Sequence, residues 1–202
     1  MSAIAIIPAR GGSQRIPGKN KRIFFGKPIV AYSIECAMES RLFSEIIVST
    51  DDPEIMQIAR DYGATPVVRL TLADAKTGTQ EVMGHVLRTH SHPIERQACC
   101  IYATCPMMTP GDLIRGWTRL NVPRTVYAMS VGTDPLADAG MFYWGWTNAF
   151  VENVPLISIN TGIVPIPGER VCDINTPEDW ARAEQMYQRW KEQLCPEVIS
   201  QE

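Results

Sequence analysis

The chain has 202 residues, of which 19 are Lys or Arg and 22 are Asp or Glu, so its formal net charge is −3. This mild acidity argues against a surface built to bind nucleic acid, and no apolar run approaches the length needed to cross a membrane. A chain of this length can bury a core without disulfide or metal staples. We therefore expect a soluble, cytoplasmic protein with a single domain over residues 1–202.

The first two-thirds of the chain alternate short apolar runs with segments of helical period. Strands are predicted at 3–7, 45–50, 65–69 and 98–102, and helices at 29–39, 53–62, 79–89 and 110–120. Alternation of strand and helix is typical of a parallel sheet with helices on both faces. The fold class predicted from this pattern is therefore α/β, with a doubly wound sheet.

Beyond Thr125 the pattern changes, with strands predicted at 126–131, 140–146, 157–166 and 170–174. A last helix begins at Thr176, where Thr176 is the N-cap, Pro177 the first helical residue and Asp179 the partner in a capping box. This helix carries an apolar stripe of Trp180, Ala183, Tyr187, Trp190 and Leu194. The stripe predicts packing in the core or against a partner.

The six cysteines form no CxxC pair, and the three histidines have no zinc-binding spacing. This pattern favours reduced cysteines in the core over a disulfide framework or a metal site.

A loop rich in glycine and positive charge, residues 7–20 with the sequence IPARGGSQRIPGKN, follows the first strand. In an open α/β sheet, ligands bind beyond the carboxyl ends of the strands. Gly11 and Gly12 allow positive φ angles and let the chain approach an anion closely, so that successive N–H groups can form a concave nest for phosphate. A triphosphate fits this loop better than one phosphate, because a hydroxyl and three cations surround it: Ser13, Arg10, Arg15 and Lys19.

Two common nucleotide-binding motifs do not match this loop. A P-loop needs GxxxxGK followed by Ser or Thr, whereas here five residues separate Gly12 from Gly18 and Asn20 follows Lys19. The GxGxxG fingerprint of dinucleotide-binding proteins is also missing after the first strand. A turn that only joins strand to helix would not need so many charged and polar side chains.

The loop and several later motifs resemble the cytidylyltransferases that activate nonulosonic acids, the CMP-sialic acid synthetase family. The resembling residues are 7–13 (IPARGGS), 16–17 (IP), 19–20 (KN), 26–29 (GKPI), 31–34 (AYSI), 47–52 (IVSTDD), 77–79 (TGT), 101–104 (IYAT), 142–145 (FYWG) and 173–180 (DINTPEDW). The pieces at 101–104 and 142–145 point to the branch that activates pseudaminic acid.

The resemblance implies a three-layer Rossmann-like nucleotidyltransferase fold with a mostly parallel sheet. It implies CTP, Mg²⁺ and an acidic nine-carbon sugar as reactants, and a CMP-sugar and pyrophosphate as products. By position, the catalytic residues are Arg10, Lys19 and Asp173, and the metal ligands are Asp173 and Asn175. The nucleotide-binding residues are Ala9, Arg10, Gly11, Gly12, Ser13, Lys19, Asn20, Arg69 and Thr79, and the sugar-binding residues are Tyr102, Thr104 and Phe142.

The chain departs from the family pattern at several places. The second metal carboxylate of the family is replaced by Asn175, and a usual Lys of the phosphate loop by Gln14. An amide oxygen holds Mg²⁺ more weakly than a carboxylate. A long insertion that helps form the sugar site and the dimer interface in relatives is reduced here to residues 132–137. The homodimer that the resemblance implies therefore lacks its usual interface segment.

Three hypotheses remain open at this point. The chain is a minimal working relative with its own acceptor sugar, or a degenerate homologue that binds nucleotide without efficient catalysis. A third hypothesis makes it an assembly subunit whose interface is formed by the apolar stripe of the last helix together with Trp144 and Trp146.

Overall fold

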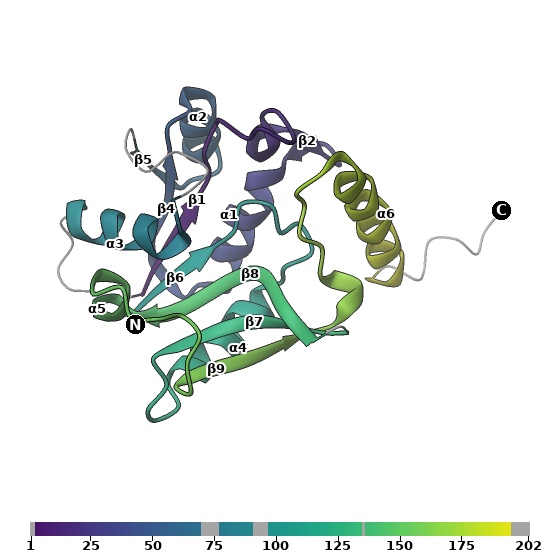
Figure 1. Ribbon diagram of the computed structural model, residues 1–202. Helices are drawn as coiled ribbons and strands as arrows, with labels where there is room; N and C mark the ends of the chain where they lie inside the picture. The colour runs from purple at the N-terminus through teal and green to yellow at the C-terminus, as the bar shows by residue number, and fades with distance from the viewer. Residues whose placement is uncertain (1–2, 70–76, 91–96, 135, 195–202) are drawn as a thin grey trace.

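The computed structural model describes residues 3–69, 77–90, 97–134 and 136–194, and these form a seven-stranded sheet between layers of helices (Figure 1). The strands are β1 (Ala3–Pro8), β4 (Phe43–Thr50), β5 (Thr65–Val68), β6 (Gln97–Ile101), β7 (Tyr127–Thr133), β8 (Leu136–Trp146) and β9 (Thr161–Ile166). Their order is β5-β4-β1-β6-β8-β7-β9. The α/β class with a mostly parallel sheet is confirmed, because only β8 pairs antiparallel with its neighbours.

Helices cover both faces of this sheet, as the apolar runs of its central strands require. On one face lie α1 (Ile29–Ser40), α2 (Pro53–Asp61) and α4 (Pro110–Leu120), and on the other lie α3 (Thr79–Thr89) and α5 (Thr147–Val151). In β1, Ile7 packs in the same cluster as Ile34 of α1. Its neighbour Ile6 packs with Met83 of α3. Successive side chains of a strand point to opposite faces, so both faces are filled.

The last helix, α6 (Pro177–Leu194), packs at one end of the molecule on a separate cluster that includes Ile16, Phe24 and Trp180 (Figure 1). The start predicted for α6, with Thr176 as the N-cap and Asp179 in a capping box, is confirmed. The Asp179 N–H donates to Thr176 Oγ1 at 3.2 Å, and Asp179 Oδ2 accepts from the Thr176 N–H at 2.9 Å.

Most of the aromatic surface required by the assembly-subunit hypothesis is inside the protein. Trp144 is fully buried, and Trp180, Ala183 and Tyr187 of the α6 stripe are also buried. Of that stripe, only Leu194 is largely exposed. The prediction that the stripe packs in the core is confirmed, and the interface assigned to it in the third hypothesis is wrong.

Strands β7 and β8 pair antiparallel as a hairpin. β7 ends at Thr133, which pairs with Leu136 at the start of β8, and Val131 pairs with Asp138. The strand predicted at 140–146 therefore begins four residues earlier, because the two strands continue pairing as far as Thr133 and Leu136.

Several other elements differ from the sequence prediction. Residues 157–160 are not strand, and the strand predicted at 170–174 is absent from the part of the chain described: a 3₁₀ helix, η2 (Gly168–Arg170), leads into irregular backbone. The buried positions there, Cys172 and Ile174, pack against α6, so their alternation reflects that contact instead of sheet pairing. Helix α5, the 3₁₀ helix η1 (Lys19–Lys21) and the small hairpin of β2 (Ile23–Phe24) and β3 (Lys27–Pro28) were not predicted.

Five cysteines are free and buried, in agreement with the reduced core predicted for them, while Cys195 lies outside the described residues. Within the described ranges, we find no helix long and apolar enough to span a bilayer.

Candidate active site

A cleft of about 240 Å³ opens where β1, β5 and β6 reach their carboxyl ends. Most of the predicted site residues line it: Arg10, Ser13, Lys19, Asn20, Arg69, Thr79, Tyr102, Thr104 and Asn175. Arg15, expected near the phosphates from its place in the loop, lines the cleft as well, and so do two polar side chains with no assigned role, Gln14 and Thr77. The fold therefore brings together segments that are up to 167 residues apart in the sequence, from Pro8 to Asn175.

The remaining predicted residues do not line the cleft. Phe142 is fully buried on the α4 face of the sheet, in the same cluster as Leu113, so its placement does not support a contact with sugar. Ala9 is also fully buried, and its N–H donates to Ser49 O at 2.9 Å. Asp173 is exposed beside the cleft and is linked to it through the side chain of Asn175.

The backbone of the phosphate loop differs from the nest predicted for it. Neither Gly11 nor Gly12 has a positive φ angle, so the loop does not use the conformational freedom that these glycines allow. The Gly11 N–H donates to Asp51 Oδ1 at 2.8 Å, and the Ser13 N–H donates to Gly11 O at 2.9 Å. These donors are satisfied within the protein, as backbone N–H groups generally are.

The loop is fixed against the connection between β4 and α2. A Cβ atom at Gly11 would lie 2.7 Å from Asp52 Oδ2, whereas at Gly12 it would meet none of the described atoms within 4 Å. Asp52 also caps α2 and pairs with Lys21 at 2.9 Å. Sequence reasoning did not assign roles to Asp51 and Asp52, although two acidic residues directly after a buried strand were a usable signal.

At its other end, the cleft contains a half-buried hydroxyl pair. The Tyr102 hydroxyl lies 2.7 Å from Thr79 Oγ1. Burial raises the pKa of Tyr102 to about 12, so the phenol is neutral and can donate a hydrogen bond. Behind it, the Tyr102 and Tyr143 ring centroids are 5.9 Å apart, and the Tyr143 hydroxyl donates to Asp138. Asp138 and Tyr143 are residues that the sequence prediction did not include in the site.

The cleft is strongly cationic. Arg10, Arg15, Lys19 and Arg69 line it, and no Asp or Glu does so among the described residues. Burial lowers the pKa of the Lys19 ammonium, while the nearby Asp173 carboxylate opposes that change. Burial likewise lowers the pKa of Arg69, against the effect of Asp51. A cavity of this kind attracts an anion with several negative charges.

Asp173 and Asn175 stand at the edge of this cationic cleft. The Lys19 ammonium donates to the backbone carbonyl of Ile174, between them, and Arg15 Nη2 donates to Asn175 Oδ1 at 3.0 Å. The described residues contain no group of three or more His, Cys, Asp or Glu side chains that could hold a metal alone. One carboxylate beside a cationic cleft still fits a divalent ion such as Mg²⁺, which commonly takes one or two carboxylates and completes its shell with phosphate oxygens and water.

Residues 4–132 match the family model described as cytidylyltransferase, which covers more than half of the chain. The chain belongs to the cytidylyltransferase family. This cytidylyltransferase is 33% identical to a pseudaminic acid cytidylyltransferase of Campylobacter jejuni serotype O:23/36, over 93% of this chain and 97% of that protein. It is also 45% identical to the CMP-N,N'-diacetyllegionaminic acid synthase of Legionella pneumophila, over 43% of this chain and 37% of that protein.

The Campylobacter match extends over 225 positions, whereas 93% of this 202-residue chain is about 188 residues. About 37 aligned positions therefore have no counterpart in this cytidylyltransferase, consistent with a shortened chain.

The fold of the cytidylyltransferase agrees with solved structures. A CMP:2-keto-3-deoxy-manno-octonic acid synthetase complexed with CTP superposes with a TM-score of 0.74 at 16% identity, covering 94% of this chain and all of that chain. The Rv0371c protein of Mycobacterium tuberculosis, in a complex with manganese, gives a TM-score of 0.67 at 15% identity over 92% of this chain and 99% of that chain. At these identities the likeness concerns the fold.

Proposed function

We propose that the protein transfers CMP from CTP to a nonulosonic acid of the pseudaminic or sialic acid type, forming the CMP-sugar and releasing pyrophosphate. The observation that carries the proposal is the cationic cleft at the carboxyl ends of the strands in a chain that matches the cytidylyltransferase family. The names of the relatives that match 93% or 43% of the chain support the class of acceptor.

In the proposed reaction, the anomeric hydroxyl of the sugar attacks the α-phosphorus of CTP. The bond from that phosphorus to the bridging oxygen of the β-phosphate breaks, pyrophosphate leaves, and the hydroxyl proton passes to solvent. Such a transfer depends mainly on alignment and on neutralising charge at the phosphates. Arg10, Ser13, Lys19 and Asn20 are placed to do this, since all four line the cleft on the same loop.

The nucleoside and the sugar would occupy the remaining walls of the cleft. Arg69 and Thr79 would contact the cytidine part, and Tyr102 and Thr104 would begin the sugar pocket. Phe142 has no part in this proposal because it is buried in the core. Gly11 would act by letting the loop approach Asp52, and Gly12 leaves open space where an anion can come close.

Mg²⁺ would be held by Asp173 together with phosphate oxygens of the nucleotide. When bound, it would neutralise phosphate charge and help align the reacting groups. The exposed position of Asp173 and its link to the cleft through Asn175 support this assignment.

Incubation with CTP, Mg²⁺ and a panel of nonulosonic acids tests the proposal, with pyrophosphate release as the measurement. We expect release with at least one of these sugars. Lys19→Ala should lower kcat/KM on the order of 10²-fold, because a half-buried cation that would face the phosphates is lost. Lys191→Ala, on the exposed side of α6, is the matched control and should leave the rate unchanged.

The degenerate-homologue hypothesis makes a different prediction for the same preparations. CTP would raise the melting temperature of the protein, but no sugar would give pyrophosphate. The specific observation in its favour is Asn175, which replaces a carboxylate and whose oxygen is already hydrogen-bonded to Arg15. Release of pyrophosphate with any sugar of the panel rejects it.

A further inference from the structure

We propose that Asn175 is a positioning residue that holds Arg15 and Asp173 in place and is not itself a ligand of the divalent ion. This inference rests on the proposed function, because it concerns how the nucleotide and its metal would be held. It also replaces the assignment of Asn175 as a metal ligand that the family pattern suggests.

The side chain of Asn175 uses both ends of its amide. Its Oδ1 accepts a hydrogen bond from Arg15 Nη2 at 3.0 Å, and its Nδ2 donates to Asp173 Oδ2. Chemistry fixes this orientation, since a guanidinium can only donate and a carboxylate can only accept. With the amide turned over, both contacts would be repulsive.

The backbone around Asn175 is held as firmly as its side chain. The Asn175 N–H donates to Asp179 Oδ2 at 3.0 Å, within the capping arrangement at the start of α6. Its neighbour Ile174 is fully buried, and the Ile174 carbonyl accepts from Lys19. Asn175 therefore reaches the cleft from a fixed point, and its amide connects the phosphate loop to Asp173.

These contacts leave no good place for a metal on Asn175. A divalent ion at Oδ1 would lie beside the Arg15 guanidinium, where two like charges repel. The amide nitrogen is a hydrogen-bond donor only and offers no lone pair to a metal. Asp173 is different, because its Oδ2 is oriented by the Asn175 amide and its Oδ1 makes no hydrogen bond to the described residues.

The inference predicts two separate effects of Asn175→Ala. Arg15 lines the cleft, so releasing its guanidinium should weaken CTP binding even without metal. Releasing Asp173 should weaken metal binding in the CTP complex. Both contacts are solvent-accessible, so each effect should be about three- to tenfold, the range of one hydrogen bond.

Two double-mutant cycles test these effects without measuring turnover. The first measures CTP affinity by calorimetry in EDTA for wild type, Asn175→Ala, Arg15→Ala and the double variant. The second measures Mn²⁺ affinity by electron paramagnetic resonance in the presence of saturating CTP, with Asp173→Ala in place of Arg15→Ala. We expect Asn175→Ala to weaken binding in the wild-type background and to have no further effect in either second background.

The opposite results are equally clear. If Asn175→Ala weakens Mn²⁺ binding as much in the Asp173→Ala background as in wild type, Asn175 is an independent ligand and the inference is overturned. If CTP affinity in EDTA does not change in Asn175→Ala, the proposed role toward Arg15 is rejected. Failure of the wild-type protein to bind CTP at all would instead reject the proposed function. Thermal melting of each variant without ligand verifies that it is folded.

Discussion

Gly11 and Gly12 are adjacent in the phosphate loop, yet the structure requires glycine at only one of them. A side chain at Gly11 would meet the Asp52 side chain, with a Cβ to Cβ distance of 2.8 Å. Asp52 cannot easily move away, because it caps α2 and pairs with Lys21. A Cβ atom at Gly12 would meet none of the described atoms within 4 Å.

We therefore expect Gly11→Ala to destabilise the protein by ~1–3 kcal/mol, the usual cost of overpacking. Gly12→Ala is the matched control and should change the free energy of unfolding by less than ~0.5 kcal/mol. Urea denaturation of both variants without nucleotide measures the difference. Equal stability of the two variants would contradict the close approach of Gly11 to Asp52.

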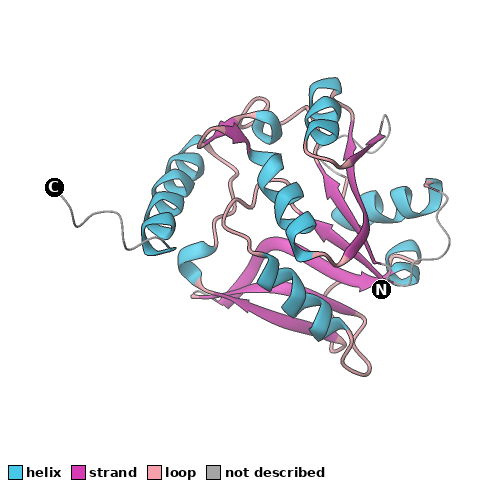
Figure 2. Ribbon diagram, turned by 180° about the vertical axis from the view of Figure 1, so that it is seen from behind, coloured by secondary structure: helices cyan, strands magenta, loops and turns pink. Residues whose placement is uncertain are grey.

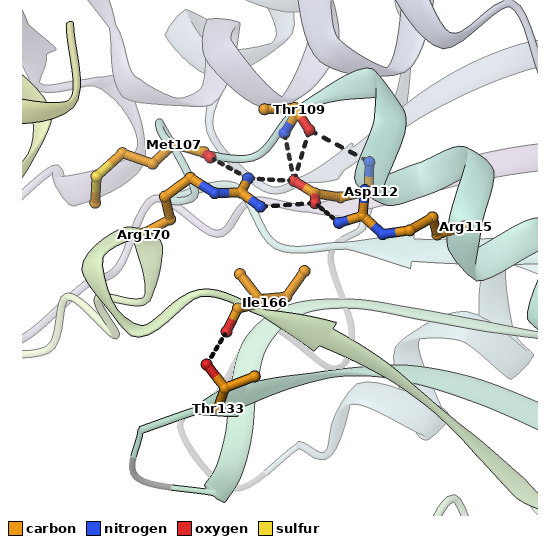
Figure 3. Close-up of polar contacts among 7 residues, drawn as sticks. All are labelled: Met107, Thr109, Asp112, Arg115, Thr133, Ile166 and Arg170. Atoms are coloured by element: carbon orange, nitrogen blue, oxygen red, sulfur yellow. Dashed lines mark hydrogen bonds and ion pairs between the residues drawn. The ribbon is translucent and has the colours of Figure 1, made fainter. Parts of the chain in front are cut away.

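A second residue-scale feature is the carboxylate of Asp112, which is fully buried at the start of α4 (Figure 3). Two nitrogens of Arg170 donate to its two oxygens at 2.6 and 3.0 Å, and the Thr109 N–H and hydroxyl both donate to Oδ2 at 2.8 Å. Arg115 pairs with it from the half-exposed side. Asp112 thereby ties α4 to η2, the segment that leads toward Asp173.

Burial by itself would raise the pKa of Asp112, but the bonds from Arg170 and Thr109 outweigh it and lower the pKa. A carboxyl whose folded pKa is depressed stabilises the protein above its unfolded pKa of about 3.9, and this stability is lost as the pH falls through the folded value. Asp112→Ala should cost ~3–5 kcal/mol near pH 7, because it leaves the Arg170 charge without its partner.

Urea denaturation across pH measures this prediction. The difference between wild type and Asp112→Ala should shrink as the pH is lowered below about 4, since protonation removes the same ion pair. Arg115→Ala serves as the comparison, and because its side chain is half-exposed it should cost no more than ~1 kcal/mol. A difference that stays constant with pH would show that the lost stability does not come from the charge of Asp112.

At the scale of elements, α6 is the support of the phosphate loop. Ile16 of that loop is buried in one cluster with Trp180 of α6 and with Ile174. The Arg22 guanidinium also lies 4.5 Å from the centre of the Trp180 ring. Helix α6, the last in the chain, therefore fixes the phosphate loop near the start of the chain. It also positions residues 173–175.

Trp180→Ala should consequently weaken CTP binding as well as stability, with a loss of ~3–5 kcal/mol in the free energy of unfolding. Leu120→Ala is the matched control: Leu120 is fully buried at the end of α4, and its loss should cost ~2–5 kcal/mol without changing CTP affinity. Calorimetric titration of the folded variants with CTP separates the two cases. Similar CTP affinity in both variants would show that α6 does not hold the loop.

At the scale of the whole molecule, a net charge of −3 coexists with a cleft lined by four cations. The parallel order of β5, β4, β1 and β6 brings the ends of these strands to one edge (Figure 2), so cations from distant segments converge there. Overall acidity therefore gives no guide to the charge of the ligand. The β7–β8 hairpin is the other feature of this scale, since Thr133 pairs with Leu136 where the family pattern led us to expect a longer segment.

The sequence by itself determined the elements that depend on local pattern. Apolar runs and helical periods predicted β1, β4, α1, α2, α3, α4 and α6 to within a few residues, and Thr176 with Asp179 marked the start of α6. The family motifs likewise identified most of the side chains that line the cleft. These signals are local because caps and periodicity involve residues only a few positions apart.

Only the tertiary structure decided how those residues are used. Alternation at Cys172 and Ile174 looked like a strand, but it reflects packing against α6. Phe142 belongs to a recognisable motif and yet lies in the core, because its strand turns that side chain toward α4. The contacts of Asn175 with Arg15 and Asp173 join residues up to 160 positions apart. No local pattern encodes such contacts, since they arise when separate segments meet at the end of the sheet.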